Sequence, residues 1–180
     1  EEIQAALRGA DMVFVACGLG GGTGSGASPV VAEIAKDMGA LTIAVVTKPF
    51  TFEGAQRNKI ADEGLNHLRR NVDAIVVIPN DRIFNIINED ISFVNSFEMV
   101  DDILKQAVQG ISDLIILPGI INVDFNDVKT IMQNTGSALM GIGIASGEER
   151  AIKAAKAAIN SPLLELSIEG ARGVLFNVAG

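Results

Sequence analysis

The chain has 180 residues, of which 48% are hydrophobic, and a formal net charge of −8. A chain of this length buries roughly 70% of its unfolded surface, so a packed core is expected. No apolar run approaches the ~20 residues of a membrane-spanning helix, and no signal peptide opens the sequence, so we expect a cytoplasmic protein without direct membrane insertion. The acidic balance and the absence of Trp and Tyr argue against a nucleic-acid partner, because nucleic-acid phosphates are bound by clustered Lys and Arg.

The first half of the sequence alternates between apolar runs and helical patterns. After the end of a helix at 1–9, we expect strands at 12–16, 41–46 and 73–78, with helices at 27–36 and 55–71 between them. Continuous β-branched runs are typical of parallel strands covered on both faces. The order βαβαβ predicts an α/β fold with a Rossmann-like parallel sheet, a nucleotide-binding domain whose ligands gather at the carboxyl ends of the strands.

The second half begins with a long helical pattern. Apolar residues that step by three or four predict a central helix over 92–117, ended by Pro118-Gly119. A short helix capped by Asp127 should follow, and then a strand over 138–145, a helix over 148–159 and a last strand over 173–178. One or two strands cannot bury a sheet face alone, so this half is interpreted as a partial second α+β domain.

A glycine-rich segment separates the first strand from the next helix. It consists of Gly20, Gly21, Gly22, Thr23, Gly24, Ser25 and Gly26. The order strand, glycine loop, helix is suited to phosphate, because glycine lets a ligand approach the backbone and the helix N-terminus presents N–H groups. A simple tight turn is the alternative interpretation.

Two common phosphate-binding motifs do not match this segment in full. A P-loop is excluded because Ala27-Ser28 follows the last glycine instead of Lys and a hydroxyl residue. Gly22-x-Gly24-x-x-Ala27 fits a dinucleotide fingerprint, but Thr47-Lys48 stands where an acidic residue is expected. The dinucleotide interpretation is therefore only weakly supported.

Four motifs resemble those of the FtsZ branch of the tubulin/FtsZ superfamily. They are GGGTGSG at 20–26, TKPFTFEG at 47–54, IPND at 78–81 and NVDFNDV at 122–128. The resemblance covers essentially the whole chain at the family's spacing, and tubulins share the first motif but not the last. It implies a GTP-binding and GTP-hydrolysing cytoskeletal protein of bacterial cell division that polymerises head-to-tail into filaments.

The resemblance also implies roles for single residues. The glycine segment would bind the GTP phosphates, Glu53 the ribose and Arg57 the nucleotide, while Asn80 and Asp102 would contact guanine and Phe97 would stack on it. A carboxylate that faces the N1–H and N2–H of guanine should discriminate GTP from ATP. Without the resemblance, each of three residues has an alternative interpretation. Glu53 could be a solvated charge, Arg57 could form a surface salt bridge, and Asp102 could interact with the helix dipole.

The last motif resembles the family's synergy loop, which enters the nucleotide site of the next subunit. Asn122, Asp124 and Asp127 would act there on the attacking water, with no covalent intermediate. A spacing of three places the two aspartates on one face of a helical turn; capping by one and solvation of the other is the alternative. GTP or GDP is the expected cofactor, with Mg²⁺ bound through the nucleotide phosphates and no metal ligands predicted in the chain.

The resemblance divides the chain into four parts. Residues 1–91 would belong to the GTP-binding domain, 92–117 would form the central helix, 118–127 the synergy loop and 128–180 the start of an incomplete C-terminal domain. Because the family has an earlier glycine-rich loop, further strands and a partner-binding tail, we expect the sequence to be a fragment. Expected partners are further copies of the protein and the anchoring and regulatory proteins of the division ring, at mid-cell. A non-polymerising Rossmann-type enzyme and a non-hydrolysing scaffold are the alternatives.

Overall fold

The protein is a three-layer α/β structure, seen in a computed structural model that describes residues 1–84, 93–116, 124–161 and 171–178. Its four-stranded parallel sheet has the order β1-β2-β3-β4. The strands are β1 (Met12–Gly18), β2 (Leu41–Lys48), β3 (Ala74–Pro79) and β4 (Gly136–Ala138). The prediction of an α/β fold with a parallel sheet is confirmed.

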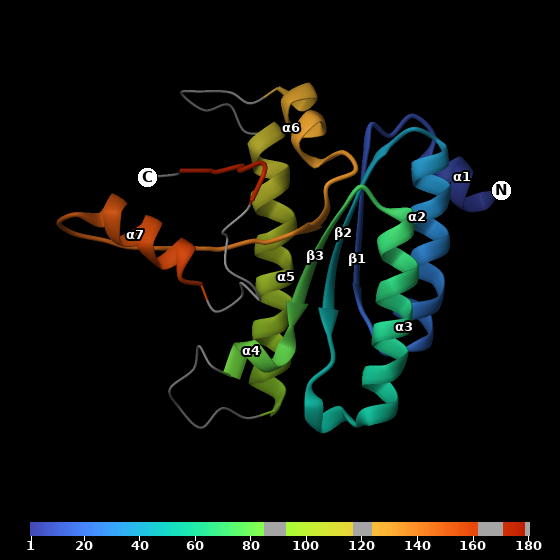
Figure 1. The fold of residues 1–180 in the computed structure, drawn as a ribbon, viewed down its shortest axis with the longest axis horizontal. Helices are drawn as coiled ribbons and strands as arrows, with labels where there is room; N and C mark the ends of the chain where they lie inside the picture. The colour runs from blue at the N-terminus through green and yellow to red at the C-terminus, as the bar shows by residue number, and fades with distance from the viewer. Residues whose placement is uncertain (85–92, 117–123, 162–170, 179–180) are drawn as a thin grey trace.

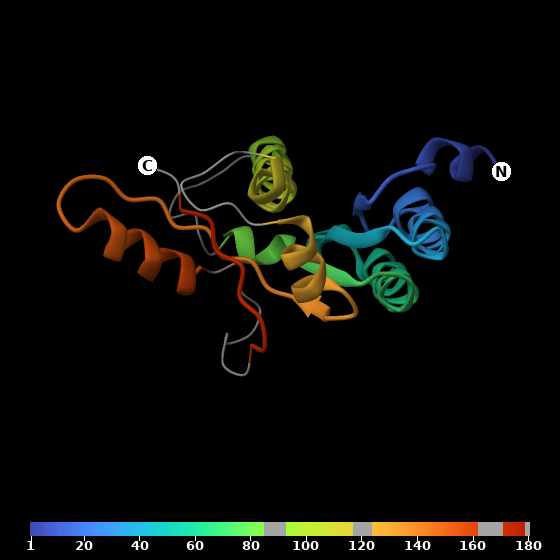
Figure 2. The ribbon, with the colours of Figure 1, turned by 90° about the horizontal axis from the view of Figure 1, so that it is seen from above.

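Helices cover both faces of the sheet (Figures 1 and 2). One layer holds α2 (Ser28–Asp37) and α3 (Ala55–Asn71), and the other holds α5 (Phe93–Ile116) and α6 (Phe125–Met132). Shorter helices are α1 (Glu2–Leu7), α4 (Asn80–Phe84) and α7 (Arg150–Ile159), and two single turns span Thr23–Ala27 and Thr51–Glu53. No helix in the described part of the chain combines the length and apolar character needed to span a bilayer.

The central strand β2 joins the two cores. Its residues Leu41 to Thr47 are all buried. Ile43 and Val45 pack with α5 and α6, whereas Ala44 and Val46 pack with α2 and α3. A strand covered on both faces must be apolar at successive positions, and this explains the uninterrupted β-branched run in the sequence.

All strands point the same way, so their carboxyl ends lie at one edge of the sheet, the carboxyl edge, and their amino ends lie at the opposite edge, the amino edge. Gly18 pairs with Thr47, and Lys48 pairs with Pro79, so β1, β2 and β3 end together. The glycine segment, the turn at Thr51–Glu53 and α4 follow these carboxyl ends, towards the bottom of Figure 1. At the other edge, near the top of Figure 1, lies α6, followed by β4, which pairs with the start of β3.

The second half of the chain departs from the sequence-based prediction. Only Gly136–Ala138 joins the sheet, and neither the remainder of the strand expected over 138–145 nor the one over 173–178 forms a strand. The extended segment instead lies against α7, so close that a Cβ on Gly141 or Gly143 would overlap backbone of that helix. An apolar run becomes a strand only where another strand pairs with it, and none does so here among the described residues.

The contact between the glycine segment and α3 predicts a stability difference between two helical glycines. A Cβ on Gly64 would lie 2.7 Å from the Cβ of Ser25, whereas a Cβ on Gly110 of α5 would meet nothing within 4 Å. We expect Gly64→Ala to lower the free energy of unfolding by about 1–3 kcal/mol through overpacking. Gly110→Ala should raise it by up to about 1 kcal/mol through helix propensity.

Urea denaturation of the two variants beside the unmodified protein measures both effects. Equal stability changes in the two variants would contradict a close packing of α3 against the glycine segment.

Candidate functional site

The start of the glycine segment is a folded loop. Gly20 has a φ of +98°, in the left-handed region that favours glycine. A Cβ there would lie 2.8 Å from Cγ of Arg57. The Gly20 N–H donates to Oγ of Ser25 at 2.8 Å, so the hydroxyl of Ser25 closes the loop. Ser25 therefore has a positioning role that the sequence did not indicate.

The rest of the segment is helical, which corrects the expectation of a loop up to Gly26. A single π-type turn at Thr23–Ala27 runs directly into α2, and the Ser25 N–H donates to the Gly21 carbonyl at 3.2 Å. The turn approaches the end of β1 so closely that a Cβ on Gly24 would overlap the Gly18 carbonyl. Since the first N–H groups of a helix have no partner within it, the N-terminus of this turn can bind an anion.

Glu53 and Arg57 lie together beside this loop. Oε1 of Glu53 accepts from the Phe50 N–H at 2.9 Å, and Oε2 pairs with Nη1 of Arg57 at 3.1 Å. The side chain of Glu53 is 11% exposed and that of Arg57 is 54% exposed. The salt bridge considered for Arg57 is therefore present, and it links the turn at Thr51–Glu53 to α3 at the carboxyl edge of the sheet.

Asn80 and Asp81 follow the end of β3. Asn80 is buried, and its Oδ1 has no hydrogen-bond partner among the described residues. Asp81 accepts from the N–H of Thr51 at 2.9 Å and from its hydroxyl at 2.5 Å, so it holds the loop after β2 against the loop after β3. A buried acceptor without a partner is costly, and this makes Asn80 a candidate ligand-binding residue.

Three phenylalanines gather at the start of α5. Phe50 is fully buried, stacks on Phe52 with 4.8 Å between ring centroids and meets the edge of Phe97 at 5.4 Å. Phe97 is 44% exposed, so part of its ring is free to stack on a planar ligand. Asp102, further along the same helix, is exposed to solvent.

Asp124 and Asp127 lie at the start of α6, and both are exposed. Asp124 is the N-cap, because its Oδ1 accepts from the Asn126 N–H at 2.6 Å, and Asp127 lies in the first turn. The prediction that Asp127 caps the helix is wrong. The helix begins earlier because Phe125 and Val128, three residues apart, pack against the core. Asn122 lies outside the described residues.

The structure therefore brings together only part of the predicted site. The glycine segment, Glu53, Arg57, Asn80 and Phe97 lie at the carboxyl edge of the sheet, whereas α6 lies at the opposite edge (Figure 1). The eight residues of β2 correspond to a separation of about 26 Å between the two edges. Within one subunit, the aspartates cannot reach a ligand bound at the glycine segment.

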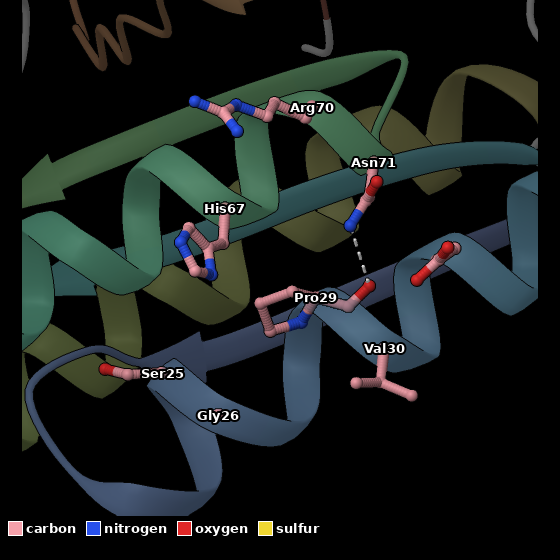
Figure 3. Close-up of a pocket in the computed structure, with 8 residues that line it drawn as sticks. Ser25, Gly26, Pro29, Val30, His67, Arg70 and Asn71 are labelled. Atoms are coloured by element: carbon pink, nitrogen blue, oxygen red, sulfur yellow. Dashed lines mark hydrogen bonds between the residues drawn. The ribbon is translucent and has the colours of Figure 1, made fainter.

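A hollow of about 360 Å³ lies outside this carboxyl-edge cluster, between α2 and α3 (Figure 3). Pro29 and His67 lie in its wall, and Asn71 donates to the Pro29 carbonyl at 3.3 Å. His67 is exposed to solvent. The hollow opens on the outer helical layer, and it touches the glycine segment only at Ser25 and Gly26.

Cys17 is partly buried at the end of β1, and its thiol donates to the Gly24 carbonyl with 3.6 Å between sulfur and oxygen. Burial raises the pKa of this thiol, opposed by a hydrogen bond with Ser28. A thiol of raised pKa is mostly protonated and a poor nucleophile, so Cys17 is a packed residue and not a candidate nucleophile. The described residues hold no group of three or more His, Cys, Asp or Glu side chains placed to bind a metal ion.

Two family models match the chain. "Tubulin/FtsZ family, GTPase domain" matches residues 1–88, and "FtsZ family, C-terminal domain" matches residues 136–180. The first contains the glycine segment, Glu53, Arg57 and Asn80, and the second begins at β4.

Solved structures agree with the models. An empty FtsZ dimer from M. jannaschii is 52% identical, with a TM-score of 0.88 over 91% of this chain and 47% of its own. A mutant of M. jannaschii FtsZ is also 52% identical, with a TM-score of 0.89 over 92% of this chain and 49% of its own. CetZ1 from Haloferax volcanii, a GDP-bound monomer, is 25% identical, with a TM-score of 0.59 over 77% of this chain and 40% of its own.

The chain thus spans about half the length of the FtsZ structures that it matches. The resemblance seen in the four sequence motifs is confirmed by the two models and by the identity over nine-tenths of the chain. The chain belongs to the tubulin/FtsZ family.

Proposed function

We propose that this chain binds GTP at the carboxyl edge of its sheet and hydrolyses the GTP of a neighbouring copy with the aspartates at the opposite edge. One observation carries the proposal. The anion-binding turn and the aspartates of α6 lie at opposite edges of one sheet, so a second copy is needed to complete a hydrolytic site. A repeated contact of one edge on the other is head-to-tail, and without closure it builds a filament.

The phosphates would lie at the N-terminus of the Thr23–Ala27 turn. The helix dipole and the N–H groups at this end favour negative charge. The loop is closed by the hydrogen bond from Gly20 to Ser25, so its N–H groups are fixed before the ligand arrives. Such preorganisation means that little structural rearrangement opposes phosphate binding.

Hydrolysis would need no covalent intermediate. A water oxygen would attack the γ-phosphorus as the bond from this phosphorus to the β–γ bridging oxygen breaks. GDP would leave with the bridging oxygen, inorganic phosphate would keep one proton of the water, and the other proton would pass to solvent. Asp124, Asp127 and Asn122 of the neighbour would orient and polarise that water, because phosphoryl transfer depends mainly on positioning and electrostatics. Mg²⁺ would arrive on the phosphates, as it usually does in such sites, and supply charge neutralisation there.

Guanine would be bound by residues at the end of β3 and along α5. Oδ1 of Asn80, which has no hydrogen-bond partner in the described part of the chain, can accept from a base N–H. The exposed part of the Phe97 ring can stack on the base. Asp102 would accept from N1–H and N2–H together. Adenine lacks this pair of donors, so the contact would select GTP.

The ribose would lie at Glu53. One carboxylate oxygen accepts from Phe50 and the other pairs with Arg57, but a carboxylate has about four acceptor sites. Sugar hydroxyls can therefore donate to Glu53 without breaking either contact. Arg57 is more than half exposed, and the guanidinium N–H groups outside this ion pair can donate to the nucleotide.

The wider role follows from family membership. We propose that residues 1–91 belong to the GTP-binding domain, 92–117 form the central helix, 118–127 the synergy loop and 128–180 the start of the C-terminal domain. The filaments would form a cytoplasmic division ring at mid-cell, held by anchoring and regulatory proteins.

Replacing the aspartates of α6 should separate hydrolysis from binding. In the full-length protein, we expect Asp127→Asn to lower GTP turnover by about 100-fold or more, the effect of removing one preorganised polar group. Asp124→Asn should also lower turnover, and it keeps the helix cap because Asn is as good an N-cap as Asp. Phosphate release measures turnover, and equilibrium titration with labelled GTP should give an unchanged affinity.

Asp113→Asn on α5 removes the same charge from a residue to which the proposal assigns no role, and it serves as the control. If GTP turnover in both α6 variants equals that of the unmodified protein, the proposed role of the aspartates is contradicted.

Asp102→Asn should change which base is preferred. Asparagine offers one acceptor and one donor, so we expect GTP affinity to fall about 10- to 100-fold, the equivalent of about 1.5–3 kcal/mol. Affinity for xanthosine triphosphate should rise, because xanthine has a carbonyl where guanine has its amino group. Competition against labelled GTP measures both, with Asp101→Asn as the matched control.

The same competition assay tests the alternative of a non-polymerising Rossmann-type enzyme. NAD that displaces GTP, together with light scattering that does not rise when GTP is added, would favour the alternative.

A further inference from the structure

A buried carboxylate at the amino edge of the sheet joins three segments of the chain. Asp73, which directly precedes β3, is 4% exposed. Its Oδ2 accepts from the Thr42 N–H at 2.9 Å, and its Oδ1 accepts from the Asn134 N–H at 3.4 Å and lies 3.6 Å from Nζ of Lys36. Its carbonyl also accepts from the Gly136 N–H at 2.9 Å. One residue thus ties β2, the end of α2 and the turn after α6 together.

Lys36 completes this arrangement from the last turn of α2. Its Nζ donates to the Val72 carbonyl at 3.2 Å and to Oδ1 of Asn134 at 3.4 Å, in addition to its ion pair with Asp73. Asn134 has a φ of +55°, a conformation that Asn adopts more readily than most residues. Lys36, Asp73 and Asn134 are called the Asp73 clamp below.

The Asp73 clamp holds the short helix that carries the aspartates. α6 has 8 residues, so its two ends are about 12 Å apart. Val128 and Met132 are buried in the core, and Gln133 directly precedes Asn134. The direction in which the start of α6 projects depends on the apolar contacts of this helix with the core and on how the turn at its end is fixed.

We propose that Lys36 and Asp73 are positioning residues for hydrolysis, because they fix α6 so that Asp124 and Asp127 meet the GTP of the neighbouring subunit. This inference rests on the proposed function. Charge also favours the arrangement, since Lys36 is the only cation that pairs with Asp73 among the described residues. Both residues lie at the amino edge of the sheet, away from the glycine segment of their own subunit, so we assign them a role through α6.

The test begins with Lys36→Gln in the full-length protein. We expect GTP turnover to fall about tenfold or more, as small misplacements of catalytic groups cause, while the affinity for GTP stays unchanged. Lys36→Arg keeps a cation within reach of Asp73 and should recover most of the turnover. Lys156→Gln, on the exposed surface of α7, is the charge-matched control.

A mixing experiment separates an effect through α6 from an effect through the glycine segment at the other end of α2. Gly24→Ala should lose GTP binding, because its Cβ would overlap the Gly18 carbonyl, yet it keeps α6. Mixed with Lys36→Gln, it supplies aspartates to the GTP of the Lys36→Gln subunit, and we expect turnover to recover. A mixture of Asp127→Asn with Gly24→Ala should recover in the same way.

The outcomes are distinct. Recovery with Asp127→Asn but not with Lys36→Gln would overturn the clamp and leave the proposed function intact, whereas recovery in neither mixture would overturn both. Normal turnover of Lys36→Gln alone would also overturn the clamp. If Lys36→Gln does not fold, Asn134→Gly takes its place, because glycine keeps the left-handed backbone and removes only one of the acceptors of Lys36, Oδ1 of Asn134.

Discussion

The parallel pairing of β1, β2 and β3 is the constraint on which the rest of the structure depends. In an antiparallel sheet, both edges would hold amino ends and carboxyl ends of strands. In this parallel sheet, all carboxyl ends lie at one edge and all amino ends at the other. Every loop that leaves a strand lies at one edge, and every loop that enters a strand lies at the other. The double burial of β2 between two helical layers keeps this arrangement rigid, since neither face can slip without exposing apolar side chains.

Much of the first half could be predicted from the sequence. The runs that became β1, β2 and β3 consist mostly of β-branched and small apolar residues. Such runs between helical segments are typical of buried parallel strands. The helix over 55–71 was predicted with the bounds that the structure has. Local pattern and tertiary packing agree there, as they do in a chain whose local choices support the global fold.

The remaining features depend on contacts between distant residues. Asp124 and Asp127 are equally good N-caps by residue type, and the burial of Phe125 decides between them. The helical turn at Thr23–Ala27, in the second part of the glycine segment, depends on the close approach of Gly24 to Gly18. Whether Oδ1 of Asn80 has a hydrogen-bond partner depends on the residues that surround it in the fold, and none of the described residues supplies one. Asp81 belongs to the motif at 78–81, but the sequence did not indicate that it accepts two hydrogen bonds from Thr51.

The placement of α6 at the edge opposite the glycine segment also determines how active sites are counted in the proposed filament. A filament of n subunits contains n − 1 complete sites, because the nucleotide of one terminal subunit has no neighbour to supply its aspartates. The average turnover per subunit therefore scales as (n − 1)/n and is lowest in the shortest filaments. One terminus would retain its triphosphate for as long as it remains a terminus, so the two ends of the proposed filament would carry different nucleotides although every subunit is identical.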